Sequence, residues 1–326
     1  MVNKTKADSL QSIKVNHDRL MMIIEPIIYG DIFDYPVSLS EIHKFCPVSI
    51  SRAELEQIVN HDTNFRKLVS CEDGYYYLTG REVLVKTRQR RKKIAEKLWR
   101  RASLIARIIQ YIPFIKSILV TGSLAINNVE EKDDLDFLII TSSKRIWFVF
   151  AILGTLQRLI SRRNLCPNYY LSLDNLGLQR KTRYIAREAI QARSMYGAEG
   201  FNNFREQNDW VYDFYPNSRN GRGLAPEEGK LSPNALLSFL SIGLERVMSG
   251  TFGDYLEKLC QKMLKHRLYI HYRLNGQDVP PEVLTNALHE IELRFHGLNH
   301  EGGIFREFDE RKQHLQTLLE NEGVSR

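Results

Sequence analysis

Two short apolar runs, with acidic residues beside the second, limit most what this chain can fold into. Residues 118–120 (ILV) lead into Thr-Gly-Ser at 121–123, and a later apolar run at 135–140 has Asp134 and Asp136 at its start. Runs of this length and composition predict buried β-strands. Alternate residues of a strand point to one face, which places Asp134 and Asp136 side by side, roughly 6–7 Å apart at ~3.3 Å rise per residue.

The acidic pair predicts a cation site. Two neighbouring carboxylates repel each other, and one takes up a proton unless a cation lies between them. Divalent ions ~3.5–4 Å apart, which clamp both oxygens of a phosphoryl displacement, suit this spacing. Magnesium, or manganese in its place, takes one or two carboxylates and completes its shell with substrate phosphate and water. Gly122 lets a phosphate approach the backbone, and Ser123 and the amides that open the next helix can donate to it.

The arrangement of these residues resembles the signature of the nucleotidyltransferase superfamily, which includes DNA polymerase beta and the minimal nucleotidyltransferases. Gly-Ser at 122–123, ten intervening residues and Asp-Leu-Asp-Phe at 134–137 follow that pattern. The resemblance implies an α/β (α+β) fold with a mixed sheet flanked by helices. It also implies that Asp134 and Asp136 are catalytic metal ligands, and that Gly122 and Ser123 hold the nucleoside triphosphate. A turn followed by a solvated edge strand is the structural alternative, and the apolar runs disfavour it.

The resemblance also implies a third carboxylate on a later strand. Residues 168–174 (NYYLSLD) predict such a strand, and Asp174 is the acidic residue in it. Strand alternation places Asp174 on one face with Ser172 and Tyr170, although Asp174 can also lie past the strand as a turn residue. Its expected role is to complete the second metal site and to help deprotonate the acceptor.

Composition predicts two or three domains in a reducing compartment. The chain has 326 residues, and its four cysteines lie far apart without a Cys-x-x-Cys pair, which argues against a zinc knuckle or a disulfide framework and favours the cytoplasm. The most apolar segment, 146–160, contains Gln157 and Arg158 and is too short to cross a bilayer, so we expect a buried helix and no membrane partner. A net charge of +7 favours a polyanionic partner.

The first eighty residues predict a polar leader, 1–18, and a small module, 19–80. Ser38 and Ser51, each followed three residues later by glutamate, predict capping boxes that open short helices. Asp-Gly at 73–74 predicts a hairpin. Three helices and a hairpin resemble a winged helix-turn-helix. The third helix carries Glu54 and Glu56 with Arg52 as its base, and those carboxylates would face phosphates, so a structural or protein-contact role is expected more than sequence reading.

The remainder divides into four further regions. Residues 81–112 predict one long basic helix, interpreted either as a solvated linker or, over 81–101, as a track for nucleic acid. Residues 113–215 form the expected nucleotidyltransferase domain, 216–233 a loop or linker, and 234–326 a C-terminal helical region with helices over 236–264, 283–295 and 305–320. His289, His296 and His300 match no known zinc spacing.

The sequence therefore predicts transfer of a nucleotidyl group from a nucleoside triphosphate to an acceptor hydroxyl, with release of pyrophosphate. A small molecule, a protein or an RNA end can serve as the acceptor in this interpretation. Two other classes stay open: a regulator whose winged helix binds DNA, and an inactive interaction module that lacks the third carboxylate.

Overall fold

The structure is a computed structural model, which describes residues 15–160, 164–219, 234–274, 292–294 and 300–323. The chain is a mixed α/β protein with two separate β-sheets. It divides into two compact units. The first holds residues up to 90, 212–221 and 299–326, and the second holds 91–211 and 222–298. The sequence grouped 299–326 with the region that precedes it, whereas the contacts assign this stretch to the first unit.

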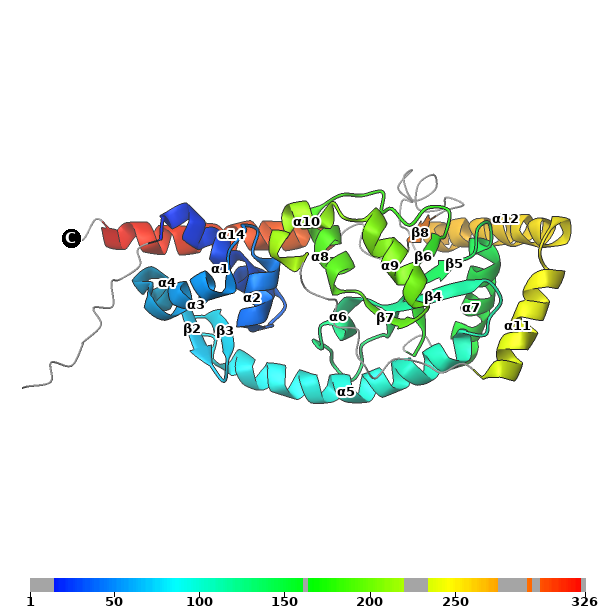
Figure 1. The fold of residues 1–326 in the computed structure, drawn as a ribbon. Coiled ribbons are helices and arrows are strands. Elements are labelled where there is room, and N and C mark those ends of the chain that lie inside the picture. The colour runs from blue at the N-terminus through cyan, green and yellow to red at the C-terminus, as the bar shows by residue number, and fades with distance from the viewer. Residues whose placement is uncertain (1–14, 161–163, 220–233, 275–291, 295–299, 324–326) are drawn as a thin grey trace, which may run out of the picture. The chain divides into compact units, whose positions relative to one another are not determined.

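The described part of the first unit combines helices with a three-stranded sheet (Figure 1). The helices are α1 (His17–Ile32), α2 (Leu39–Phe45), α3 (Arg52–His61), α4 (Thr63–Leu68) and α14 (His300–Gly323). The strands β1 (Val37–Ser38), β2 (Val69–Glu72) and β3 (Tyr75–Leu78) pair antiparallel in the order β1-β3-β2. The 3-10 turn η1 (Pro216–Ser218) belongs to the same unit.

Local sequence explains several of these elements. The hairpin expected at Asp73-Gly74 is present, and both residues adopt positive φ, as its tight turn requires. Ser38 and Glu41 form a complete capping box at the start of α2. Ser51 accepts a hydrogen bond from the Glu54 amide at the start of α3, which is half of the expected box. The short helices therefore begin where the sequence predicts.

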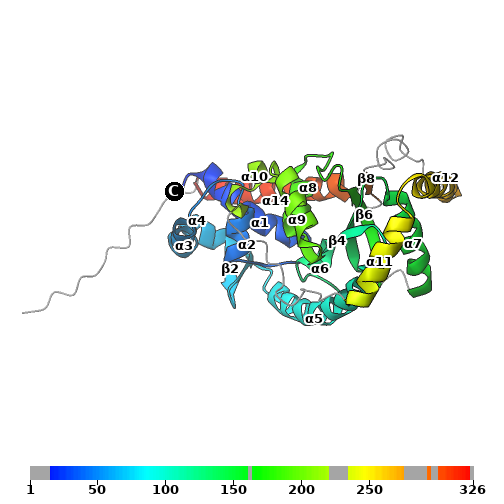
Figure 2. The same cartoon turned by 45° about the vertical axis from the view of Figure 1, so that its right-hand side comes forward.

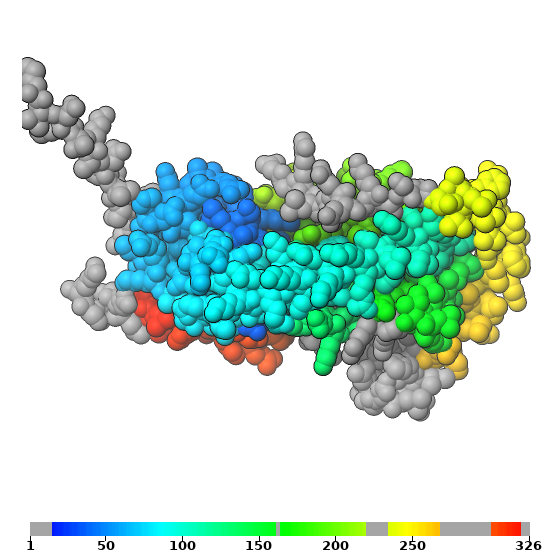
Figure 3. Space-filling view, turned by 90° about the horizontal axis from the view of Figure 1, so that it is seen from below, coloured from blue at the N-terminus to red at the C-terminus, as the bar shows by residue number. Residues whose placement is uncertain are grey.

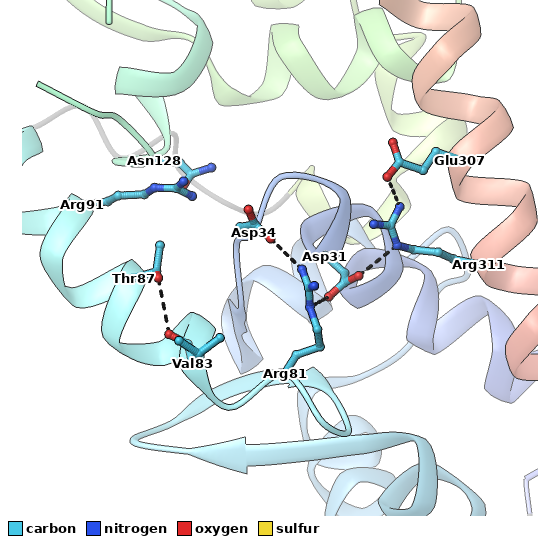
Figure 4. A network of polar contacts seen from close by, with 9 residues as sticks. All are labelled: Asp31, Asp34, Arg81, Val83, Thr87, Arg91, Asn128, Glu307 and Arg311. Atoms are coloured by element: carbon cyan, nitrogen blue, oxygen red, sulfur yellow. Dashed lines mark hydrogen bonds and ion pairs between the residues drawn. The ribbon is translucent and has the colours of Figure 1, made fainter. Parts of the chain in front are cut away.

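A buried carboxylate joins α14 to the rest of the first unit. The side chain of Asp31 is 6% exposed and lies between two guanidinium groups, with Arg81 Nε at 3.1 Å and Arg311 Nε at 2.9 Å (Figure 4). Arg81 also binds Asp34, and Arg311 also binds Glu307. Lys312 Nζ binds Glu25 at 2.8 Å, beside the same helix. These ion pairs explain why α14 packs on α1 although nearly the whole chain separates the two helices.

The second unit contains a five-stranded mixed sheet in the order β7-β4-β5-β6-β8. Its strands are β4 (Ile115–Val120), β5 (Asp136–Thr141), β6 (Cys166–Ser172), β7 (Arg193–Tyr196) and β8 (Glu292–Arg294). β5 and β6 run parallel and the other pairs are antiparallel. The helix α7 (Ile146–Ile160) connects β5 to β6, which is the usual link between parallel strands.

Helices cover both faces of this sheet (Figures 1 and 2). On one face, α5 (Val83–Ile109) and α7 pack against Ile118, Phe137, Ile139 and Tyr170 in a common core. On the other face lies α9 (Ala198–Gln207), where Gly200 approaches Ser117 and Ile140 so closely that a Cβ would lie 2.3 Å from the serine hydroxyl. The helix α8 (Arg183–Gln191) contacts the single turn α6 (Gly122–Ala125). The short helix α10 (Val211–Phe214) follows at the boundary of the unit.

The described part of the second unit also contains the helices α11 (Ala235–Val247) and α12 (Thr251–Leu274). The expected long basic helix is confirmed as α5, and the helix expected over 305–320 is confirmed within α14. The helix expected over 283–295 lies mostly outside the described residues, and its described part, Glu292–Arg294, is the edge strand β8 instead. Of the expected linker, 220–233 lies outside the described residues, as do the leader up to residue 14, His289 and His296. In the described part of the chain, no helix has the length and apolarity needed to cross a bilayer.

Candidate active site

The glycine of the Gly-Ser turn lies directly against the second acidic residue. Gly122 follows β4 with a φ of +64°, and a Cβ placed on it would lie 2.6 Å from Asp136 Oδ2. A side chain at this position would both strain the backbone and displace the carboxylate. The Thr121 amide also donates a hydrogen bond to the Asp136 carbonyl oxygen at 3.1 Å. The structure therefore brings together two residues that the sequence separates by thirteen positions.

The carboxylate of Asp136 is held in a protein environment that disfavours its charge. The pKa of Asp136 is raised to about 7, mainly by burial and also by the negative charges of Asp134, Glu188 and Asp133. A hydrogen bond with the Cys166 side chain opposes the shift. Asn168 Nδ2 donates to Asp136 Oδ1 at 2.9 Å. Near neutral pH this group is poised between its two protonation states, and a bound cation would favour the ionised one.

Asp134 lies two residues before β5 begins, in the connection from α6. The sequence placed it on the strand, so strand alternation does not fix its direction as expected. It nevertheless lies near enough to Asp136 for its charge to act on that carboxyl.

Side chains of α5 fix the connection that leads to Asp134. Trp99 Nε1 donates to Asn127 Oδ1 at 2.7 Å, and Arg91 binds Asn128 Oδ1 at 3.0 Å and Glu130 Oε1 at 2.8 Å. The buried Val129 lies between these contacts along the chain. The long basic helix thus holds the loop that presents the first carboxylate.

Ser123 lies in the first turn of α6, beside Gly122. Its side chain is half-buried and makes no hydrogen bond to another residue in the described part of the chain. Thr121, the residue before the turn, makes no capping bond through its side chain. The Ser123 hydroxyl and the first amides of α6 are consequently placed to donate to an anion beside the acidic pair.

The structure does not bring Asp174 to this site. Asp136 pairs with Cys166 at the start of the parallel strands β5 and β6, and Thr141 pairs with Ser172 at their end. Asp174 follows Ser172 and therefore lies roughly 20 Å from Asp136, at the opposite end of the sheet, as judged from ~3.3 Å of rise per residue. There it accepts hydrogen bonds from the hydroxyls of Ser143 and Ser172 in a turn. The expected third ligand is thus a turn residue, the alternative that the sequence left open.

Three residues near the acidic pair did not emerge from the sequence. Glu188 of α8 acts on Asp136 through its charge. Asn168 reaches Asp136 from β6, at the strand end where a third carboxylate was expected. Arg193 of β7 pairs with Val120, next to the Gly-Ser turn. The helix predicted between the two strands was a usable signal, because such a crossover makes strands parallel and brings their first residues together.

The donor set fits a magnesium ion that is completed by its substrate. Among the described residues, no group of three His, Cys, Asp or Glu side chains is arranged to hold a metal ion. Magnesium does not require such a cage, since it commonly binds one or two carboxylates and takes its other ligands from phosphates and water. Asp134 and Asp136 supply hard oxygen ligands, and the raised pKa of Asp136 marks a carboxylate that lacks charge compensation.

Much of the positive charge around the first unit is already engaged. Arg88 binds Glu41 at 3.0 Å and stacks on Tyr35, with its guanidinium carbon 3.6 Å from the ring centroid. On α3, Arg52 binds Glu56 at 3.1 Å. These contacts argue against α3 as a base-reading helix. On α5, eight basic side chains are exposed: Lys86, Arg90, Lys92, Lys93, Lys97, Arg100, Arg101 and Arg107.

A cavity of about 440 Å³ lies in the first unit, between β3, α4 and α14. Leu78 and Leu315 line it together with Arg81 and Arg311. Both arginines bind the buried Asp31, so the charges at this wall largely compensate one another. This cavity includes neither acidic residue of the pair.

Comparison with known proteins does not assign this chain to a family. The chain was compared with protein-family models, with curated proteins and with solved structures, and none of them matches it.

Proposed function

We propose that this protein is a metal-dependent nucleotidyltransferase that moves a nucleoside monophosphate from a nucleoside triphosphate to an acceptor hydroxyl. The observation that carries the proposal is the close approach of Gly122, at positive φ, to an Asp136 carboxylate whose pKa is raised to about 7. This turn places an acidic group, whose charge the protein disfavours, directly against a glycine backbone at the start of a helix. A magnesium-bound triphosphate supplies both the phosphate and the cation.

In the proposed reaction, the acceptor oxygen attacks the α-phosphorus of the triphosphate. The bond from that phosphorus to the bridging oxygen breaks, and pyrophosphate leaves with the bonding electrons. Asp134 and Asp136 would hold a magnesium ion, which would neutralise charge on the phosphates. The backbone at Gly122 and the hydroxyl of Ser123 orient the triphosphate. Catalysis of this kind depends mainly on positioning and on charge stabilisation.

Glu188 replaces Asp174 in this proposal as the third carboxylate. Its charge acts on Asp136, whereas Asp174 lies at the other end of β5 and β6. Glu188 accepts the proton of the acceptor hydroxyl, either directly or through water.

Incubation with each α-labelled triphosphate, Mg²⁺ or Mn²⁺ and panels of small-molecule, protein and RNA acceptors tests the proposal. We expect labelled product from the wild-type protein, no product from Asp134→Asn or Asp136→Asn, and a strong decrease for Glu188→Gln. Asp174→Asn is the matched control and should keep its activity. Label transfer that survives both substitutions in the acidic pair would refute the assignment.

A second candidate function is nucleotide binding without transfer, as in a regulator or an interaction module. The hydrogen bond from Asn168 to Asp136 favours it, because β6 brings an amide rather than a carboxylate to the acidic residue. In that case the protein binds a triphosphate with Mg²⁺ and yields no product with any acceptor. Isothermal titration with a non-hydrolysable triphosphate, run beside the label assay, separates the two functions.

The exposed basic face of α5 favours an anionic acceptor, and we propose nucleic acid as one. Each phosphate contact releases counterions, so affinity for RNA should decrease steeply as salt rises. Exchange of Lys92, Lys93 and Lys97 for glutamine should make that dependence shallower. A gel shift whose salt dependence is the same for this variant and for the wild type excludes α5 as the binding face.

A further inference from the structure

The helix α11 has a half-buried polar stripe, Ser238, Ser241 and Glu245, and its remaining positions are mostly large apolar residues, none of which is buried. A helix with this composition is normally enclosed by protein or lipid. The large apolar residues of α11 are 44–71% exposed, and Figure 3 shows the segment that contains them, in yellow, at the surface. We call this set the α11 patch: Leu236, Leu237, Phe239, Leu240, Ile242, Leu244 and Val247.

Polar contacts hold α11 at its two ends rather than along its length. Asn234 caps the first turn through its side chain, and its own amide donates to the hydroxyl of Tyr111 at 2.6 Å. In the last turn, Glu245 accepts from Lys116 Nζ at 2.9 Å and from the Phe114 amide at 2.6 Å. An isolated helix of 13 residues is only marginally stable in water. These anchors therefore orient the α11 patch but leave its apolar area uncovered.

The exposed area is large enough for a stable protein interface. A half-exposed Leu, Ile or Phe leaves roughly 100 Å² of surface open, so the α11 patch exposes on the order of 700 Å². The α11 patch alone exceeds the ~300–600 Å² patch of a typical monomer and is close to the ~800 Å² that each partner contributes to a standard complex.

The lack of charged residues in the α11 patch favours a second copy of this chain as the partner. From Ala235 to Leu244 the helix contains no charged residue, and its polar positions are two serines and a glycine. In a two-fold interface the same surface faces itself, so charge in the patch would repel its own copy, and here there is none. A helix that binds at a membrane surface instead carries a basic face opposite its apolar one, which α11 lacks. We propose that the α11 patch is the interface through which two copies of this chain associate.

Sedimentation velocity of the full-length chain, over about 1–100 μM, tests this proposal. We expect the wild type to sediment as a dimer, at twice the monomer mass of 38.0 kDa. The double variant Phe239→Glu/Leu240→Glu places charges on residues that are 71% and 52% exposed, so it should sediment as a monomer with an unchanged circular dichroism spectrum. Val83→Glu, at an apolar residue 68% exposed on α5, is the matched control and should remain dimeric.

Three outcomes overturn the proposal. The first is a wild type that remains monomeric at 100 μM, which would mean that the patch is covered within one chain. The second is a Phe239→Glu/Leu240→Glu variant that still forms the dimer, which would place the interface elsewhere. The third is flotation of the wild type, but not of the double variant, with phosphatidylcholine–phosphatidylglycerol vesicles, which would make the patch a lipid-binding surface. The readout is independent of any nucleotidyl transfer.

Discussion

Exchange of Asp136 for asparagine should stabilise the second unit, although it removes a residue that we place in the active site. Burial raises the pKa of this carboxyl from 3.8 to about 7, so the folded protein prefers its protonated form. Asparagine is uncharged at every pH and close in shape to the protonated acid. Its Oδ1 can still accept the hydrogen bond from Asn168.

The size of the effect depends on pH in a defined direction. Because the folded pKa lies above the unfolded value, the wild type loses stability as pH rises from about 4 to about 7. This rise in pKa, at ~1.36 kcal/mol for each tenfold change in the proton-binding constant, lowers the free energy of unfolding at pH 8 by on the order of 4 kcal/mol. At pH 5 the wild type is destabilised by about 2 kcal/mol, because the carboxyl is protonated in the folded protein and mostly ionised in the unfolded one. The gain from Asp136→Asn should therefore roughly double between pH 5 and pH 8.

Tryptophan fluorescence during urea unfolding, in the presence of a chelator, measures this gain in stability for the second unit specifically. The three tryptophans of the chain, Trp99, Trp147 and Trp210, all lie in the second unit. Asp174→Asn is the control: it keeps one of the two oxygens that accept from serine hydroxyls, so it should lose one hydrogen bond and cost about 1 kcal/mol at either pH. An Asp136→Asn protein that is less stable than the wild type at pH 8, or whose gain is the same at both pH values, would refute the reasoning.

Three further predictions concern the site and the first unit. Gly122→Ala should lower the free energy of unfolding by about 1–2 kcal/mol, through the left-handed backbone alone, and should abolish label transfer, because its Cβ would displace Asp136. Stabilisation by Mn²⁺ in a fluorescence-monitored thermal melt should increase from pH 6 to pH 8, since the cation competes with the proton on Asp136. Arg311→Ala leaves the buried Asp31 with one guanidinium partner fewer and should destabilise the first unit by about 1–3 kcal/mol, which hydrogen exchange of α14 amides would report.

Each of these predictions has a control in the same element or assay. Gly154→Ala in α7, where an added Cβ meets nothing within 4 Å, should be neutral or stabilising. Arg306→Ala, at an exposed position of α14, should leave hydrogen exchange unchanged. Equal losses at Gly122 and Gly154, pH-independent stabilisation by Mn²⁺, or unchanged α14 exchange in Arg311→Ala would each contradict the corresponding prediction.

The sequence predicted individual helices and strands better than it predicted which of their residues lie close together. Asp73-Gly74 and Ser38 act on their own neighbours, so the hairpin and the start of α2 follow from local chemistry. The approach of Gly122 to Asp136 was anticipated as a pairing of motifs, because both adjoin apolar runs that form neighbouring strands. Alternation along a strand, however, decides only which face a residue takes.

The errors arose where register and topology decide position. Asp174 was predicted because the resemblance implies a third carboxylate on a later strand. Whether its end of β6 lies near Asp136 depends on the direction of the strand, and β5 and β6 run parallel. Glu188 lies on a helix that returns to the Gly-Ser turn only through the packing of α8 on α6. No spacing of residues in the sequence predicts that α8 packs beside the Gly-Ser turn. The assignment of α14 to the first unit depends in the same way on long-range ion pairs such as Arg311–Asp31.

Because β5 and β6 run parallel, the two ends of this strand pair have different roles. Both strands start beside Gly122 and finish at turns that contain Ser143 and Asp174. Loops at the finishing end can lengthen or accept inserted segments without moving a carboxylate, because several rungs of backbone pairing lie between. That end is consequently the place to graft a tag or a new binding loop, while the starting end tolerates almost no change in backbone shape.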